Sequence, residues 1–353
     1  MAIDIFSTHA LLAAIETMLP ATTFLRDRYF PTGAGDIFAT NDVLIEYREG
    51  TKKIAPHVTR NSDGMIIERT GFKARKYEPP MIAPKRTITV DDLYYKGFGE
   101  ALYSELTPQQ REASLITRDL QELDESITRT EEAMCAEVMT TNALEVTVHA
   151  DENDAGEKQT IHFYDGASNS ATYTPTTSWD ATGAKILEDL YAMYNQMAQK
   201  GLPATDIIIG ANVASALINN SVIRDLLDNR RYELGGIKPE DMPQGAFLLG
   251  TLNAYGPQFN VISYPMTYAK LDGTSAKYIG DNDLIMTAPG ARRLLYGRVD
   301  QVEPSDGMIH SYAKKRVPLF ETVRQTRELA LRSCPLPVVN AQNCFLKSTV
   351  VFS

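Results

Sequence analysis

The longest regular pattern of apolar and polar positions in the chain runs from Thr107 to Met139. Thr107, Pro108 and Gln110 are a helix start signal, because T-x-x-Q is a capping box and proline fits the first helical position. We predict one helix over these 33 residues, about 50 Å long at about 1.5 Å per residue. Apolar residues recur at the spacing of one buried helical face: Ile116, Leu120, Leu123, Ile127, Met134 and Val138.

The segments before this helix carry too few apolar residues for a core of their own. Residues Ser7–Leu19 predict a short amphipathic helix, and the following TFLRDRYFPTGAGD predicts an irregular segment. Between Asp42 and Arg86, VLIEY and MIIERTGFKARKY predict two strands joined by a turn at Asn61–Gly64. A long two-stranded arm is unstable alone, so we expect this hairpin to project from the body and lie on another surface.

The segments after the helix alternate strand and helix patterns. LEVTVHA and KQTIHFY predict a strand pair, and Ile186–Met197 predicts an amphipathic helix that ends at Gly201. DIIIG predicts a buried strand, and FLLG, FNVISYP and DLIMTA predict further apolar strands, with short helices in ANVASALINN and SVIRDLLDN. VPLFETVRQTRELALRS predicts one long extended segment, and PLPVVNAQNCFLKSTVV predicts terminal strands.

Charge is distributed unevenly along these elements. The predicted helix has eight acidic and three basic residues, a net charge of −5, whereas residues 42–86 have ten basic and six acidic residues, a net charge of +4. The whole 353-residue chain carries −10, which disfavours a general nucleic-acid binder. The sequence has no membrane-spanning apolar run and no signal-peptide pattern, so we expect a soluble protein made inside the cell.

Candidate catalytic and metal-binding chemistry is sparse. Cys135, Cys334 and Cys344 have no metal-ligand spacing and are expected to be reduced thiols. His149 and His162 are placed to approach each other across the strand pair, but they lack a third ligand. The acidic pairs Asp124-Glu125 and Glu131-Glu132 are expected on the solvated face of the long helix. We therefore predict no catalytic residue, cofactor or metal, and favour a structural or interaction role.

Several sequence blocks, taken in order, resemble one protein family. These are TFLRDRYFPTGAGDIFATNDVLIEYREGTKKIAPHV, EEAMCAEVMTT, SWDATGAKILEDLYAM, DIIIGANVASALINNSVIRDLLDNRR, DLIMTAPGARRLLYG and LALRSCPLPVVNAQNCFLKS. The chain resembles the lambda-type major capsid proteins of tailed bacteriophages, the major capsid protein E family, which have the Hong Kong 97-type fold. Each block is loose on its own, and the resemblance rests on their order and spacing over nearly the whole chain.

The resemblance implies an α+β capsid fold with a defined division of the chain. Residues 1–41 would be an N-terminal arm and residues 42–86 an extended loop. Residues 87–169 and 312–330 would be a peripheral domain with the spine helix 107–139, and residues 170–311 and 331–353 an α/β axial domain.

The resemblance also implies a function and partners. The chain would be a non-enzymatic subunit that self-assembles into hexamers and pentamers of an icosahedral head enclosing double-stranded DNA. It would be assembled in the host cytoplasm and end in the virion, with separate scaffolding and portal proteins, a possible decoration protein, and no membrane. An encapsulin-type compartment shell is the main alternative, and an intracellular α/β enzyme is a weaker one.

Contacts between subunits are the functional sites that this hypothesis predicts. The basic loop would lie over a neighbour, with its charges facing acids of the neighbouring spine helix. The candidate residues are Arg60, Asp63, Lys73, Arg75, Lys76, Glu122, Glu125 and Glu132.

Overall fold

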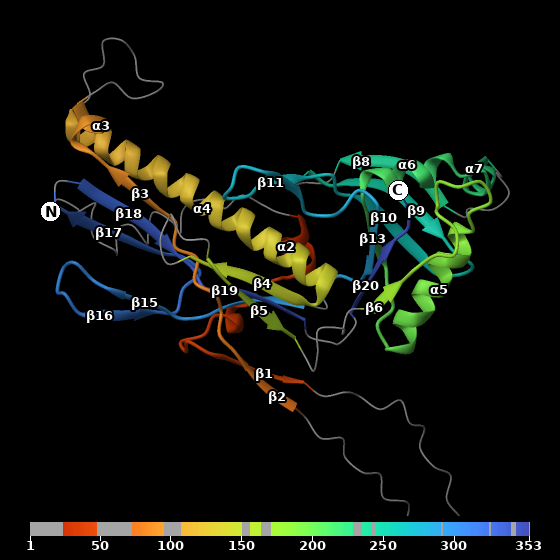
Figure 1. The fold of residues 1–353 in the computed structure, drawn as a ribbon, viewed down its shortest axis with the longest axis horizontal. Coiled ribbons are helices and arrows are strands. Elements are labelled where there is room, and N and C mark those ends of the chain that lie inside the picture. The colour runs from red at the N-terminus through yellow and green to blue at the C-terminus, as the bar shows by residue number, and fades with distance from the viewer. Residues whose placement is uncertain are drawn as a thin grey trace, which may run out of the picture.

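The computed structural model describes residues 24–47, 73–94, 107–149, 156–163, 171–228, 235–241, 245–290, 292–324, 326–339 and 344–352. A long helix occupies one end of the molecule and a seven-stranded sheet the other (Figure 1). In these parts of the chain, no helix combines the length and the apolar character needed to cross a membrane. The predicted helix at Ser7–Leu19 and the predicted turn at Asn61–Gly64 lie outside the described residues.

The long helix is α4, Pro108–Thr141, and its predicted start is confirmed. The Thr107 side chain accepts a hydrogen bond from the Gln110 N–H at 3.3 Å, and Gln110 Oε1 accepts one from the Thr107 N–H at 2.9 Å. The helix ends at Asn142, which adopts a left-handed conformation (φ 54°) and donates its N–H to the Val138 carbonyl. These 34 residues span about 50 Å.

The first half of α4 packs on a three-stranded antiparallel sheet. This sheet has the order β17 (Val317–Val323), β18 (Thr326–Arg332) and β3 (Lys85–Ile88). All six predicted stripe residues of the helix are buried, which confirms its predicted register. The shared core contains Ile116, Leu120, Leu123 and Ile127 from the helix, with Ile88, Phe320, Leu329 and Leu331 from the sheet.

The long extended segment predicted near the C-terminus is a hairpin instead. β17 and β18 pair antiparallel, with Val323 opposite Thr326, and Arg324 makes the turn with φ 55°. The prediction was wrong because the turn sequence V-R-Q-T contains no glycine, proline or asparagine to mark it. Lys85 and Arg86, which the expected extended loop included, belong to β3 of this sheet.

The second half of α4 joins a larger core at the centre of the molecule. There it meets α2 (Phe24–Tyr29) and the paired strands β14 (Arg292–Tyr296) and β19 (Pro335–Val339). The segment predicted to be irregular therefore contains a helix, and the short 3-10 turn Ala34–Asp36 follows it. Phe24, Leu25, Tyr29 and Phe30 all bury their side chains in this core, which explains why the helix forms.

The seven-stranded sheet has the order β6-β20-β13-β7-β10-β9-β8. β7 and β10 are parallel, as are β20 and β6, and the other neighbours are antiparallel. Its strands are β6 (Ala171–Tyr173), β7 (Asp206–Ile209), β8 (Gly235–Asp241), β9 (Phe247–Asn253), β10 (Gln258–Ser263), β13 (Asp283–Thr287) and β20 (Phe345–Thr349). The predicted strands DIIIG, FLLG, FNVISYP and DLIMTA are thus confirmed, and the structure places them side by side in one sheet.

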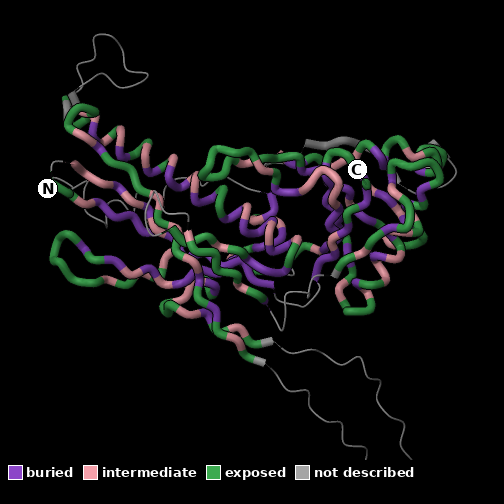
Figure 2. The backbone as a smooth tube through the Cα atoms, in the orientation of Figure 1, coloured by how far each residue is buried: buried purple, intermediate pink, exposed green. Residues whose placement is uncertain are grey.

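Three helices cover this sheet, namely α5 (Ile186–Gln199), α6 (Ala211–Asn219) and α7 (Ser221–Asp228). Their apolar faces and the sheet enclose a second core, which holds Trp179, Leu190, Met193 and Phe259. Figure 2 shows buried positions in the strands at the sheet end as well as along α4. The predicted stop of α5 is also confirmed, because Gly201 follows it with φ 86°.

The remaining elements are short. The hairpins are β1 (Val43–Tyr47) with β2 (Lys73–Tyr77), β4 (Ala143–Val148) with β5 (Glu157–His162), β11 (Thr267–Ala269) with β12 (Ser275–Lys277), and β15 (Val299–Val302) with β16 (Ile309–Tyr312). Helix α3 (Val90–Tyr94) precedes α4. In Figure 1, β15–β16 lies at the end of the molecule that holds the first half of α4.

Candidate functional site

The described residues contain no group of three or more His, Cys, Asp or Glu side chains placed to hold a metal ion. The expected proximity of His149 and His162 is wrong, because His162 pairs with Ala143 at one end of the β4–β5 hairpin and His149 follows Val148 at the other. Six residues of strand separate the two positions by roughly 20 Å.

The three cysteines are buried, free thiols. Burial raises the pKa of the Cys135 and Cys344 thiols and raises that of Cys334 to about 11. Because the thiolate is the reactive form, these side chains are inert packing groups at neutral pH.

The most strongly charged interior feature is a group of five side chains on α4 and its neighbours, which we call the ionic cluster: Arg26, Asp124, Glu131, Glu132 and Arg316. Arg316 Nε donates a hydrogen bond to Asp124 at 2.6 Å. Its two terminal nitrogens donate to the two oxygens of Glu131, Nη1–Oε1 at 2.7 Å and Nη2–Oε2 at 3.1 Å. Arg26 Nη1 reaches the second Glu131 oxygen at 3.1 Å. Arg26 belongs to α2, the three acids belong to α4, and Arg316 directly precedes β17. The cluster therefore joins α2, α4 and the β17–β18 hairpin.

The charges of this cluster stabilise one another. Burial alone would raise the pKa of the Glu131 carboxyl, but the Arg316 and Arg26 guanidiniums outweigh burial and hold that pKa below its ordinary value. Burial likewise disfavours charged Arg316, yet the attraction of Glu131 raises the pKa of its guanidinium overall. Both groups are therefore ionised at neutral pH inside the protein.

Glu132 fastens α2 to α4. Its two carboxylate oxygens accept hydrogen bonds from the backbone N–H groups of Leu25 and Arg26, both at 2.8 Å, and from the Tyr264 hydroxyl at 2.8 Å. Glu131 and Glu132 are both 0% exposed and Asp124 is also buried, so the expected place of these three acids on a solvated face is wrong. The physical reason is that cations and donors distant in sequence satisfy these carboxylates. Glu132 is thus engaged inside its own subunit.

The opposite side of α2 is fastened to the seven-stranded sheet. Asp206, at the start of β7 and 0% exposed, accepts hydrogen bonds from Arg28 Nε at 2.7 Å and from the Tyr29 hydroxyl at 3.0 Å. Asn260 donates to the other oxygen of the same carboxylate at 2.9 Å. Consecutive residues of one short helix therefore bind α4 on one side and β7 on the other, which fixes the two ends of the molecule to each other.

The predicted contact residues of the loop lie on β2 or outside the described residues. Lys73 begins β2, Arg75 and Lys76 follow in it, and Arg60 and Asp63 are not among the described residues. Lys76 Nζ is 2.7 Å from Asp42 in its own hairpin, and its side chain is still 66% exposed.

The predicted acidic contact residues of α4 already have cationic partners in their own subunit. Glu122 binds Arg118 at 3.0 Å and Arg86 at 2.5 Å, and Glu125 binds Arg129 at 3.0 Å. In Figure 1, β1–β2 and α4 lie on opposite sides of the body, so the structure does not bring the basic hairpin and these acids together within one chain.

The ionic cluster was missed by sequence reasoning, although one signal pointed to it. The apolar stripe of α4 skips from Ile127 to Met134, and Glu131 occupies the position between them on the same face. An acid within a buried stripe calls for a buried cation. Arg26, set among the aromatic residues of the arm, is one of the two cations that bind Glu131, and Arg316 is the other.

Comparisons with known proteins agree with this architecture. The sequence matches the family described as Phage major capsid protein E over residues 7–350. The structure is similar to a prophage protein of E. coli CFT073 described as a capsid protein, with a TM-score of 0.66, 16% identity, and 98% of this chain and 99% of that chain covered. It is also similar to the mature capsid of bacteriophage PhiM1, with a TM-score of 0.50, 9% identity, and 94% and 88% of the two chains covered.

An encapsulin of Synechococcus elongatus PCC 7942 has a TM-score of 0.44 and 9% identity, with 97% of this chain and 95% of that chain covered. No curated protein matches the sequence significantly. The family match spans nearly the whole chain, and the similar solved structures share the Hong Kong 97-type capsid fold. The chain therefore belongs to the phage major capsid protein E family and is a structural subunit of a multimeric capsid.

Proposed function

We propose that this chain is the major head protein of a tailed phage, a non-enzymatic subunit that forms hexamers and pentamers of an icosahedral shell around double-stranded DNA. The observation that carries this proposal is the family match over residues 7–350 together with the capsid fold of the described residues. The net charge of −10 also suits a container wall, because an acidic wall does not hold packaged DNA tightly.

We divide the described chain between two domains. The peripheral domain comprises α4, the β17–β18–β3 sheet, β4–β5, β14–β19 and β15–β16, and the axial domain comprises the seven-stranded sheet with α5, α6 and α7. The separate cores on the first half of α4 and inside the sheet end support this division. It moves β14, β15, β16 and β19 from the axial domain expected from the sequence to the peripheral domain. The extended loop then runs between β1 and β2.

The ionic cluster and the Asp206 contacts give the subunit a fixed shape. In the proposed shell each subunit must hold its two domains at one angle to fit its neighbours. α2 contributes to that constraint, because it binds α4 through Glu132 and β7 through Asp206, beside the central core that α4 shares with the sheet. Breaking one side of this bridge should loosen the angle between the two domains.

Lateral attraction between subunits comes partly from the basic loop. Lys73, Arg75 and Lys76 would face acidic surface of a neighbour, with Glu122 and Glu125 on α4 as the candidate acids. Within their own subunit these two acids form exposed ion pairs, which contribute little to folding stability. Replacing those pairs by ion pairs with a neighbouring subunit therefore costs little folding free energy. Apolar contacts must therefore supply most of the assembly free energy.

The partners of this subunit are other copies of itself and separate phage proteins. Scaffolding and portal proteins would direct assembly in the host bacterial cytoplasm, a decoration protein would bind the finished shell, and DNA would be enclosed without sequence-specific contacts. An encapsulin-type shell is the alternative, and the contents of purified particles distinguish the two: nuclease-protected DNA supports a phage head, and an enclosed enzyme supports a compartment.

The loop contacts are tested by light scattering during assembly of purified subunits at low and high salt. Reversal of Lys73, Arg75 and Lys76 to Glu should slow assembly at low salt and leave the thermal melt unchanged. The matched control reverses Lys200, which follows α5, and Lys270 and Lys277 of the β11–β12 hairpin, and all three side chains are exposed. Each set changes the net charge from −10 to −16, so the general repulsion between chains is the same in both. Equal slowing by the two sets would contradict the loop contact.

A further inference from the structure

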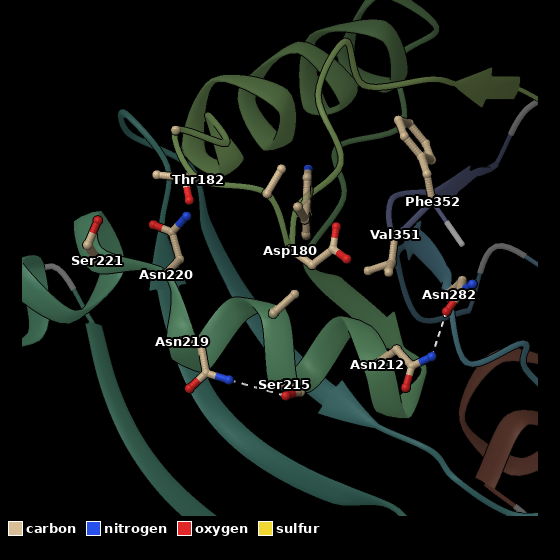
Figure 3. A pocket seen from close by; sticks show the side chains of 14 residues that line it. Asp180, Thr182, Asn212, Ser215, Asn219, Asn220, Ser221, Asn282, Val351 and Phe352 are labelled. Atoms are coloured by element: carbon tan, nitrogen blue, oxygen red, sulfur yellow. Dashed lines mark hydrogen bonds between the residues drawn. The ribbon is translucent and has the colours of Figure 1, made fainter.

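A polar hollow of about 630 Å³ lies on the outer side of α6, at the sheet end of the molecule (Figure 3). Asn212, Ser215 and Asn219 follow one another along α6 and point toward it. Of the fourteen described residues that line the hollow, Asp180 alone has an ionisable side chain. The hollow therefore offers no amine, thiol or imidazole to a reactive ligand. An amine in unusual surroundings lies instead beside the ionic cluster.

This amine belongs to Lys315, an exposed residue between β16 and β17 that directly precedes the buried Arg316. Its Nζ is 5.5 Å from the centre of the Tyr296 ring, whose face weakly attracts a cation. The hydroxyl of the same tyrosine donates a hydrogen bond to Glu131 at 3.0 Å. Lys315 therefore lies against a side chain that belongs to the surroundings of the ionic cluster.

The acids near Lys315 are already bound by arginines. Glu131 accepts hydrogen bonds from both Arg316 and Arg26. Asp27 accepts one from Arg26 Nε at 2.9 Å. Among the residues that the structure describes, Lys315 itself has no ion-pair partner. Its ammonium form therefore stands beside two guanidiniums without a carboxylate of its own.

These surroundings favour the neutral amine. Removal of water from around the side chain lowers the pKa of Lys315, and the positive charges of Arg26 and Arg316 lower it further. Glu131 and Asp27 act in the opposite direction, but the pKa stays below its ordinary value. A lysine becomes a better nucleophile when it is desolvated or placed next to other cations, because its neutral form is the one that attacks.

Other lysines of the described chain have ordinary surface partners. Six of them lie within ion-pair distance of a carboxylate, namely Lys76, Lys85, Lys158, Lys185, Lys277 and Lys347. Lys158 and Lys185 are the clearest contrast to Lys315. Their side chains are 71% and 70% exposed, and the carboxylates that bind them raise the pKa of both amines. Both are freely accessible, but their amines are held in the charged form.

We propose that Lys315 is a preferred site of acylation by small acyl donors of the acyl phosphate or thioester class. The neutral Nζ attacks the carbonyl carbon of the donor, the bond from that carbon to oxygen or sulfur breaks, and an amide forms. Phosphate or a thiolate leaves with the electron pair of the broken bond, and the proton lost from the nitrogen passes to water. The amide carries no charge, so the modification ends the repulsion of this side chain by Arg26 and Arg316. This modification site is independent of the proposed shell.

Acetylation of the purified, unassembled full chain tests the site. The protein is treated with acetyl phosphate at mildly alkaline pH, and peptide mass spectrometry follows the rate at each lysine, with fragmentation separating Lys315 from Lys314. We expect Lys315 to react several-fold faster than Lys158 and Lys185, although both of those side chains are freely accessible. Equal or slower acetylation of Lys315 would overturn the proposal.

A pH series and a matched variant show whether charge is the cause. The rate at Lys315 should reach its plateau at a lower pH than the rate at Lys158, because each rate follows the neutral fraction of its amine. Glu145→Gln removes the acid that binds Lys158 at 2.6 Å, so it should speed the acetylation of Lys158 several-fold and leave Lys315 unchanged. The same plateau pH for both lysines, or no gain at Lys158 in this variant, would overturn the proposed cause of the reactivity.

Discussion

Arg316 and Glu131 form a buried two-bond ion pair, with Nη1–Oε1 at 2.7 Å and Nη2–Oε2 at 3.1 Å, although they lie 185 positions apart in the sequence. Glu131 belongs to α4 and Arg316 directly precedes the β17–β18 hairpin. The pair therefore joins two segments that are far apart in the sequence, and its loss should lower the stability of the whole subunit.

Arg316→Met tests the contribution of this pair to stability. The substitution removes the guanidinium that binds both Glu131 and Asp124 and leaves these two carboxylates buried, so the free energy of unfolding should fall by about 3–5 kcal/mol. Urea denaturation of the subunit measures this loss. The matched control is Arg118→Met, which breaks an exposed pair with Glu122 and should cost at most about 1 kcal/mol. Similar losses in the two variants would contradict a special role for the buried pair.

The same pair predicts how stability depends on pH. The folded pKa of Glu131 lies below that of the unfolded chain, about 4.3, so the unfolded state binds more protons as pH falls. The stabilisation is present above about pH 5 and is lost on acidification through and below that range. The free energies of unfolding of the wild type and of Glu131→Gln, measured between pH 7 and pH 3, should thus differ less as the pH falls.

The control for this pH series is Glu125→Gln, which makes the same change in an exposed pair with Arg129. Its difference from the wild type should stay small at every pH. If the stability difference between Glu131→Gln and the wild type stays large at pH 3, the charge of the Glu131 carboxylate is not the source of the stabilisation.

The apolar stripe of α4 predicts a different, pH-independent loss. Leu120 and Leu123 are almost fully buried against the three-stranded sheet, so either Leu→Ala substitution should cost about 2–5 kcal/mol of unfolding free energy. Gln121→Ala, on the exposed side of the same turn, should change stability by less than about 0.5 kcal/mol. Thermal melts of the three variants measure this, and a Leu123→Ala melt equal to that of Gln121→Ala would refute the helix packing.

Local patterns in the sequence were sufficient for much of the fold. The α4 start at Thr107, its buried stripe and the stop of α5 at Gly201 are set by residues within a few positions of each other. The strand at Asp206–Ile209 was also predicted correctly, because a short run of isoleucines is typical of a fully buried strand.

Features that depend on distant partners could not be predicted in the same way. Glu132 resembles any helix-surface acid until Leu25, Arg26 and Tyr264 are placed around it. The β17–β18 turn at Arg324 lacks a turn signature, because the strand pairing and the packing on α4 hold it in place. Contacts between subunits are harder still to predict from the sequence, since they are formed by exposed residues whose partners belong to another chain.

The central claim is that this chain builds a shell, and electron microscopy of the purified wild-type protein tests it most directly. The account predicts closed shells, tubes, or hexamers and pentamers of the subunit, formed by the chain alone or on addition of its scaffolding protein. Particles of a single subunit under all of these conditions, with no higher assembly at any protein concentration tested, would contradict it.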